Sequence, residues 1–89
     1  MPHSRYSSEE IVRRGEQLYD QQIRAHVEPQ HRGRIIVINI ETGDYEIDNS
    51  TLPAARRAQA NDPDAALYSK RIGFDAVYDF RAVPGPVKQ

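Results

Sequence analysis

The sequence predicts a small α+β domain in which two helices pack on one face of a four-stranded antiparallel sheet. Residues 34–48 have the pattern of a β-hairpin, since a β-branched run is followed by a turn and a strictly alternating return strand. An amphipathic helical pattern precedes this hairpin, and an Ala-rich helical segment with two further strand patterns follows it. The resulting order, helix-strand-strand-helix-strand-strand, favours one sheet with both helices on the same side.

Length and composition exclude several classes of protein. The 89 residues have room for one domain, which we place at 7–82, between a flexible leader at 1–6 and an irregular tail at 83–89. Cysteine is absent, which excludes disulfides, thiolate chemistry and cysteine metal sites. No segment has the apolar core of a signal peptide or the length to span a bilayer. We therefore expect a soluble cytoplasmic protein with no membrane partner.

The near-neutral charge balance predicts no strong electrostatic field around the molecule as a whole. The net charge is −1, from 12 basic and 13 acidic residues spread along the chain, and this does not attract nucleic acid or anionic membranes over long distances. Ten of the twelve basic residues are arginine, so the sequence still allows a local basic patch.

The first helix begins at a capping box, Ser7-Ser8-Glu9-Glu10, in which Ser7 accepts from the amide of Glu10 and Glu10 reaches back to the amide of Ser7. Tyr6 and Ile11 form the matching hydrophobic staple. Apolar or small residues then recur at helical spacing, at Ile11, Val12, Gly15, Leu18, Tyr19, Ile23 and Val27. We expect Pro29 to end this helix.

The hairpin register decides which side chains share a face. We predict a loop that sets Ile40 opposite Tyr45 and Ile38 opposite Ile47, which gives one apolar face of Ile36, Ile38, Ile40, Tyr45 and Ile47. A two- or four-residue loop produces this register, and Thr42 favours the longer one because it resists the positive φ of a type I′ turn. A three-residue loop with Gly43 left-handed would instead place Tyr45 opposite Asn39.

The second half of the chain predicts a short helix and two strands. Asn49-Ser50-Thr51 offers N-caps, Pro53 suits a first turn, and Asn61-Asp62-Pro63-Asp64 ends the Ala-rich helix. Strands follow at residues 66–72 and 76–81, joined by a tight turn at Gly73-Phe74.

This arrangement predicts an uncovered, partly apolar sheet face. If both helices lie on one side, the other side is too apolar for a monomer's surface, which favours a homodimer or a partner docking site. The residues that we expect on this docking surface are Ile35, Val37, Tyr68, Ile72 and Val77.

Two short blocks of sequence, Thr-Gly-Asp-Tyr and Arg-Ile-Gly, stand at a characteristic spacing. The matching positions are Gly15, Tyr19, Gly33, Arg34, Val37, Ile38, Thr42, Gly43, Asp44, Tyr45, Ile47, Ala54, Ala58, Pro63, Asp64, Tyr68, Arg71, Ile72, Gly73, Ala76 and Val77. With them, residues 10–80 resemble a family of small stand-alone bacterial and archaeal proteins of uncharacterised function. The resemblance implies a small α+β protein of antitoxin-like or accessory type, and it implies no catalytic residue.

The sequence offers weak candidates for catalysis and metal binding. Ile40-Glu41-Thr42-Gly43 is similar to the hydrophobic-Asp-Thr-Gly loop of aspartic proteases, but Glu replaces Asp and a hairpin apex is the wrong support. His26 and His31, with Glu28 between them and His3 as a further candidate, lack the spacing of a zinc site. The carboxylates of Asp44, Glu46 and Asp48 line one strand face, as expected for a solvated face. We therefore predict a non-enzymatic protein without a cofactor.

Nucleic-acid binding is the alternative to protein docking. The candidate residues are Arg32, Arg34, Arg56, Arg57, Arg71 and Arg81, with Tyr68, Tyr78 and Phe80 as stacking partners on the sheet. Nearby acidic residues, Asp62, Asp64, Asp75 and Asp79, would offset this charge. Arg71 also fits a structural role, as a strand arginine paired with Asp79 or Glu46.

Overall fold

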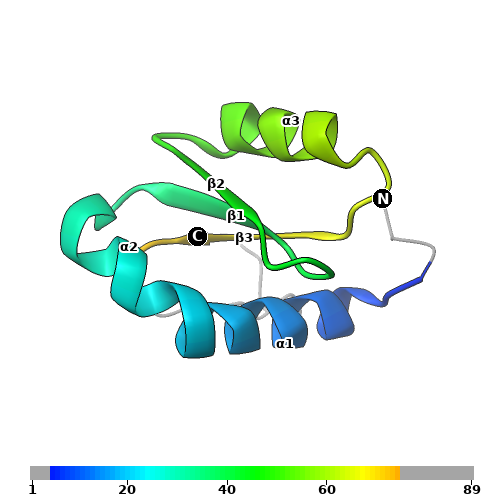
Figure 1. Cartoon of the computed structure of the whole chain (residues 1–89), viewed down its shortest axis with the longest axis horizontal. Coiled ribbons are helices and arrows are strands. Elements are labelled where there is room, and N and C mark those ends of the chain that lie inside the picture. Colours follow the sequence, from blue (N-terminus) through cyan, green and yellow to red (C-terminus); the bar gives the residue numbers. More distant parts are fainter. Residues whose placement is uncertain (1–4, 75–89) are drawn as a thin grey trace, which may run out of the picture.

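In a computed structural model of the chain, which describes residues 5–74, a three-stranded antiparallel sheet lies between two layers of helix (Figure 1). The order of elements is α1 (Ser8–Leu18), a π-helical segment η1 (Tyr19–Ile23), α2 (Arg24–His31), β1 (Ile35–Asn39), β2 (Tyr45–Asp48), α3 (Thr51–Asn61) and β3 (Leu67–Arg71). β1 is central, and the strand order is β2-β1-β3. The α+β class is therefore confirmed.

The predicted four-stranded sheet is wrong for the part of the chain that the structure describes. The predicted hairpin pair is present, and β3 pairs with β1 from the other side, with Ile35 opposite Arg71 and Ile38 opposite Tyr68. The fourth strand was expected at residues 76–81, which lie outside the described residues, as does the predicted tail at 83–89.

The placement of both helices on one face is also wrong. The helical segment from α1 to α2 covers one face, where Tyr19, Ile23 and Val27 pack with Ile36, Ile38, Tyr68 and Ile72. α3 covers the other face, where Ala54 and Ala58 pack on Val37 (Figure 1). β1 is apolar on both sides, so both need a cover, and the small alanines let α3 lie close. β2 and β3 run parallel on either side of β1, and the crossover between them carries α3 over the face that α1 leaves open.

The N-terminal helix begins as predicted but continues further. Ser7 Oγ accepts from the backbone N–H of Glu10 over 3.1 Å, which confirms this half of the capping box. Pro29 does not end the helix, because α2 continues to His31. Gly15 faces the core, and a β-carbon there would overlap the ring of Tyr68. Because Gly15 has no side chain, the ring of Tyr68 on β3 can pack directly against the backbone of α1.

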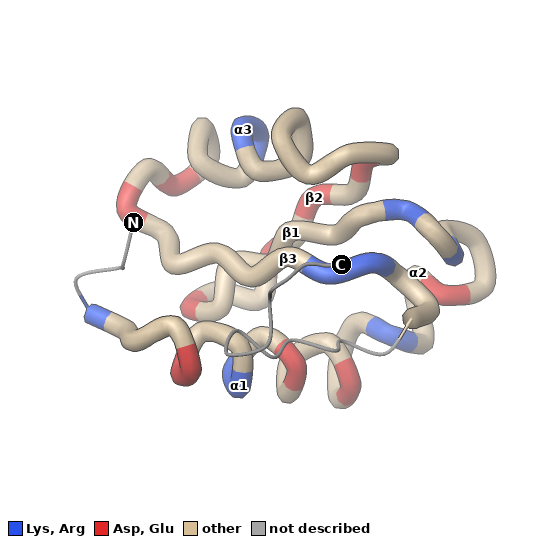
Figure 2. Tube along the Cα trace, turned by 180° about the vertical axis from the view of Figure 1, so that it is seen from behind, with Lys and Arg blue, Asp and Glu red and all other residues tan. Residues whose placement is uncertain are grey.

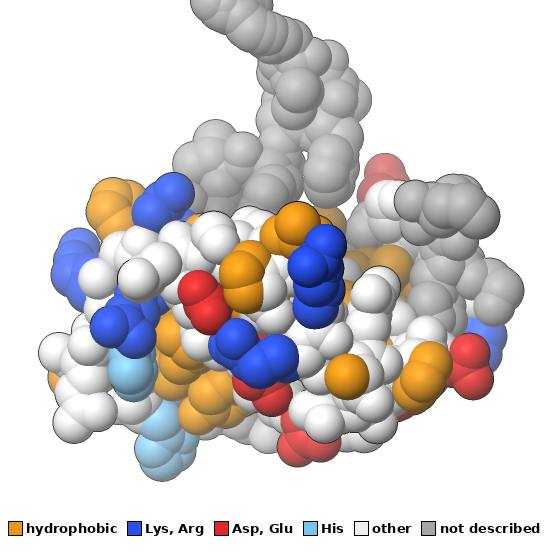
Figure 3. All heavy atoms as spheres, turned by 90° about the horizontal axis from the view of Figure 1, so that it is seen from above, with side chains coloured by type: hydrophobic (Ala, Val, Ile, Leu, Met, Phe, Trp, Pro, Cys, Tyr) orange, Lys and Arg blue, Asp and Glu red, His pale blue; other side chains and the backbone are white. Residues whose placement is uncertain are grey.

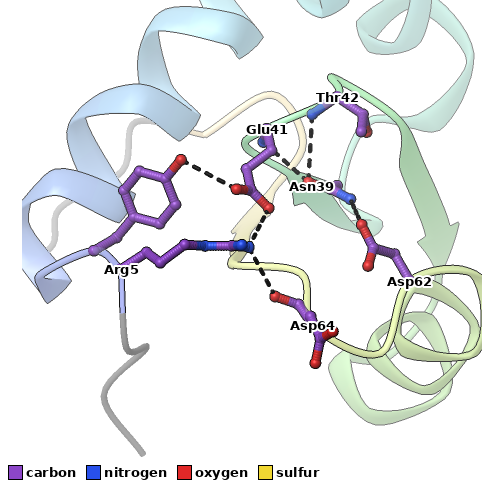
Figure 4. Close-up of polar contacts among 7 residues, drawn as sticks. Arg5, Asn39, Glu41, Thr42, Asp62 and Asp64 are labelled. Atoms are coloured by element: carbon purple, nitrogen blue, oxygen red, sulfur yellow. Dashed lines mark hydrogen bonds and ion pairs between the residues drawn. The ribbon is translucent and has the colours of Figure 1, made fainter.

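The hairpin register differs from the prediction by two residues. Ile38 lies opposite Tyr45 and Ile36 opposite Ile47. The cause is Asn39, whose Oδ1 accepts from the backbone N–H groups of Glu41 and Thr42 at 2.9 and 3.4 Å, so the turn starts earlier than expected (Figure 4). The shift keeps side-chain parity, so Ile36, Ile38 and Ile40 still share the buried face.

The hairpin loop is tied to the chain on both sides (Figure 4). Arg5 pairs with Glu41 over 2.9 Å, and the Nδ2 of Asn39 donates to Asp62 over 3.1 Å. Arg5 and the partly buried Tyr6 belong to the segment that we assigned to a leader, and both contact this loop through Glu41. Over residues 5–74, no helix combines the length and the apolar character that a membrane span requires.

Candidate functional site

The end of the sheet where β1 begins and β3 ends is closed by backbone hydrogen bonds. The N–H of Gly33 donates to the carbonyl of Ile72, and the N–H of Ile72 donates to the carbonyl of Arg34, both over 2.8 Å. The connection between α2 and β1 therefore continues the β1–β3 ladder. Gly33 and Gly73 take φ values of 90° and 86°, in the region that favours glycine, so both segments turn sharply here.

Three arginines lie at this end of the sheet. The Nη1 of Arg71 donates to the carbonyl of Gly33 over 2.8 Å. Arg32 lies over Gly73, since a β-carbon built on that glycine would lie 2.6 Å from its Cγ. Arg34 is exposed and immediately precedes β1. We call Arg32, Arg34 and Arg71 the arginine patch; Figure 2 shows the basic segments at the start of β1 and the end of β3 side by side.

Ion pairing distinguishes this patch from most other cations of the molecule. Carboxylates pair with Arg5, Arg13, Arg14, Arg24, Arg57 and Lys70. Among residues 5–74, no carboxylate forms an ion pair with an arginine of the patch. Seen from above α3, Lys and Arg side chains gather with histidines at the end of the molecule occupied by α2 and the start of β1 (Figure 3). Within residues 5–74, therefore, the arginines at this end of a nearly neutral chain have no carboxylate partner.

An exposed aromatic ring adjoins the patch. Phe74 is 52% exposed, and its backbone N–H donates to the carbonyl of Arg71 over 3.3 Å. The Cζ of Arg32 lies 5.7 Å from the centroid of the ring, within the range of a cation–π contact. The patch thus combines guanidinium groups with a ring that is outside the core.

Tyr19 joins the π-helical segment to α2. Its buried hydroxyl donates to Glu28 over 2.9 Å. Burial, reinforced by the hydrogen bond with Glu28, raises the pKa of Tyr19 to about 12. This hydrogen bond holds α2 against the π-helical segment from which Tyr19 projects.

The other predicted nucleic-acid residues do not join the patch. Arg57 pairs with Glu46 at 2.9 Å and Asp48 at 3.0 Å, so its charge is neutralised on β2. Arg56 lies exposed on α3. Tyr68 is buried in the core, whereas Arg81, Tyr78 and Phe80 lie outside the described residues. The predicted pairing of Arg71 with Glu46 is wrong, because Glu46 binds Arg57; the other predicted partner, Asp79, is not described.

The residues predicted for a docking surface belong mainly to the core. Val37, Tyr68 and Ile72 are buried, and Ile35 is partly buried against α3. Val77 lies outside the described residues. The docking hypothesis required an uncovered apolar sheet face, and α3 of the same chain covers that face.

Within residues 5–74, the acidic and histidine candidates are not grouped into a metal site. A pocket of about 210 Å³ lies between the hairpin and α3, lined by Asn39, Thr42, Asp44, Tyr45, Glu46, Ala58, Asn61 and Asp62. Its polar groups largely satisfy one another, as in the bonds from Asn39 to Asp62 and from Asn61 to Glu46. No three His, Asp or Glu residues between positions 5 and 74 are grouped so as to hold a metal ion, and His3 lies outside this range.

Sequence reasoning missed two features. Phe74 was assigned only to a turn, although it follows Arg71 closely and comes directly after a glycine. Lys70 is buried, with its Nζ 3.9 Å from Glu16 and 4.0 Å from the centroid of the Tyr19 ring. The alternation of β3 gave the only available signal, because it places Lys70 on the same face as Tyr68 and Ile72.

Comparison with known proteins supplies no relative, since no family model, curated protein or solved structure matches the chain. The resemblance to small prokaryotic proteins stays a prediction.

Proposed function

We propose that the protein binds nucleic acid through the arginine patch of Arg32, Arg34 and Arg71. The observation that carries this proposal is that three arginines lie at one end of the sheet and have no carboxylate partner within residues 5–74. A guanidinium group matches the geometry of phosphate oxygens and stays charged at any physiological pH. We also propose that the protein acts in the cytoplasm.

The orientation of Arg71 supports this role. Its Nη1 is held by the carbonyl of Gly33, an uncharged acceptor, so the side chain is positioned while its charge is retained. A guanidinium group carries five N–H donors, and the contact with Gly33 engages only one of its nitrogens. The remaining donors suit an external anion.

The net charge of the chain bounds how strongly it is expected to attract nucleic acid. Because that charge is −1, attraction comes from the patch alone and acts at short range. Three phosphate contacts to a single strand predict a salt slope of about −2, which weakens binding about 20-fold between 50 and 200 mM salt.

Fluorescence anisotropy with a labelled 12-nucleotide single strand tests the proposal. Arg34→Gln is the sharpest variant, since this side chain is exposed and no hydrogen bond or ion pair links it to residues 5–74. We expect several-fold weaker binding and a salt slope reduced by about 0.7 to 1. Arg13→Gln, on the exposed face of α1, is the matched control and should bind as the wild type does.

Two results would overturn the proposal. One is the absence of measurable binding at low salt, and the other is an Arg34→Gln variant with unchanged affinity and salt slope. Docking through the sheet face is not proposed, since α3 covers that face. Self-association and the lack of catalytic activity stay predictions.

A further inference from the structure

We infer that the nucleic acid bound at the arginine patch is single-stranded and that one of its bases stacks on Phe74. This inference rests on the proposed function and names its substrate class. It comes from the position of an exposed ring beside Arg32, one of the arginines that have no carboxylate partner within residues 5–74.

The turn at the end of β3 fixes the ring next to the patch. The hydrogen bond from the N–H of Phe74 to the carbonyl of Arg71 closes this turn over 3.3 Å. The adjacent Ile72 is bonded to Gly33 and Arg34 through its backbone. The ring is thus carried by a turn that is hydrogen-bonded to the segment leading into β1.

The ring has surface available for a ligand. Arg32 contacts it from 5.7 Å, and about half of the side chain stays exposed. A base can stack on the open part while Arg32 supplies a cation–π contact, an arrangement that recurs in proteins that bind single strands. The phosphates next to that base then lie within the neighbourhood of Arg71 and Arg34.

The same geometry disfavours a duplex. Bases in a duplex are paired and stacked on one another, so none offers an open face to an aromatic side chain. A duplex would contact the arginines through its phosphates only. The inference therefore predicts a preference for single strands that depends on Phe74.

Three labelled probes separate base stacking from phosphate binding: a thymidine 12-mer, the same strand annealed to its complement, and an abasic 12-mer with the same number of phosphates. The wild type should bind the thymidine strand most tightly. Phe74→Ala should weaken binding of that strand roughly 5- to 100-fold and leave binding of the abasic strand unchanged. Tyr45→Ala removes a partly exposed ring at the start of β2, at the opposite end of the sheet, and should change neither.

The outcomes distinguish this inference from the proposed function. If all three probes bind equally and depend on Arg34, nucleic-acid binding stands and the stacking inference is overturned. The same conclusion follows if a folded Phe74→Ala variant, checked by circular dichroism, binds the thymidine strand as tightly as the wild type. If no probe binds, both proposals fail.

Discussion

The guanidinium group of Arg71 donates to the main-chain carbonyl of Gly33 over 2.8 Å, across the join between β3 and the start of β1. Most other basic side chains between residues 5 and 74 are held by carboxylates instead. Arg71 is therefore oriented by the fold without losing its charge, which is the property that an anion-binding side chain needs.

Alanine at position 73 is expected to destabilise the fold more than alanine at position 33. Both glycines have positive φ, where an L-residue costs about 1–2 kcal/mol. At Gly73 a β-carbon would also lie 2.6 Å from the Cγ of Arg32, whereas nothing lies within 4 Å at Gly33. Urea unfolding followed by circular dichroism measures both variants. Equal losses of stability would show that Arg32 moves aside without cost.

Removing the charge of Lys70 is expected to cost less stability than removing Glu16. Lys70→Met keeps an apolar stem of similar volume and removes an ion that is expensive to bury, so its stability should stay within about 1 kcal/mol of the wild type. Glu16→Ala leaves the ammonium group without its carboxylate and removes the acceptor of the Tyr68 hydroxyl, with an expected loss of about 2–3 kcal/mol.

Thermal and urea unfolding of both variants check this order, with Gln17→Ala on the exposed face of α1 as the control for helix propensity. A Lys70→Met variant that loses more stability than Glu16→Ala would show that the ammonium group has a further partner or that methionine packs poorly there.

The start of α1 and the strands of the hairpin were predictable from the sequence because each has a local cause. Ser7 caps α1 through one side-chain contact, and the alternation after Gly43 specifies a return strand without reference to distant residues. The register was not predictable, since it depends on how the side chain of Asn39 organises the loop. The face that α3 covers was also missed, because the direction of a crossover is a property of the whole sheet.

The arginine patch also depends on contacts between residues distant in sequence, so the sequence alone could not predict it fully. The sequence named Arg32, Arg34 and Arg71 among six candidates, yet it is the ladder between β1 and β3 that brings their segments to the same end of the sheet. Which arginines are neutralised depends on pairs such as Arg57 with Glu46, which sequence separation does not reveal. Phe74 acquires its position only through the turn at Gly73.

Stability is expected to fall with rising pH in a range set by Tyr19. Burial raises the pKa of this phenol from 10.0 to about 12 in the folded protein. Below pH 10 both states keep the proton, so the full stability is present. Between about pH 10 and 12 the unfolded state loses the proton first, and stability falls by up to ~1.4 kcal/mol per pH unit.

Urea unfolding at a series of pH values, with Tyr19→Phe beside the wild type, isolates this effect from the other tyrosines. The variant should be less stable at pH 8, because Glu28 loses one of its two donors within residues 5–74 and keeps only Arg24, and should show a shallower fall above pH 10. Parallel curves for the two proteins would contradict the assignment of the raised pKa to Tyr19.

Asn39 and Asp62 are expected to behave as a matched donor and acceptor. The buried amide of Asn39 gives its oxygen to the loop and its nitrogen to Asp62, at 3.1 Å. Asn39→Asp keeps the oxygen but sets a second carboxylate against Asp62, so a loss of about 1–3 kcal/mol is expected at pH 7. Part of it should return on acidification, because a proton on the introduced carboxyl group restores a donor and removes the repulsion.

The exchange variant Asn39→Asp with Asp62→Asn provides the control for this pair. It restores one amide and one carboxylate in the opposite order, so its stability should exceed that of Asn39→Asp alone and depend less on pH. A double-mutant cycle from urea unfolding gives the coupling energy between the two positions. If the exchange variant is no more stable than Asn39→Asp, the contribution of Asn39 lies in the turn at Glu41 and Thr42 and not in the bond that joins the hairpin to the end of α3.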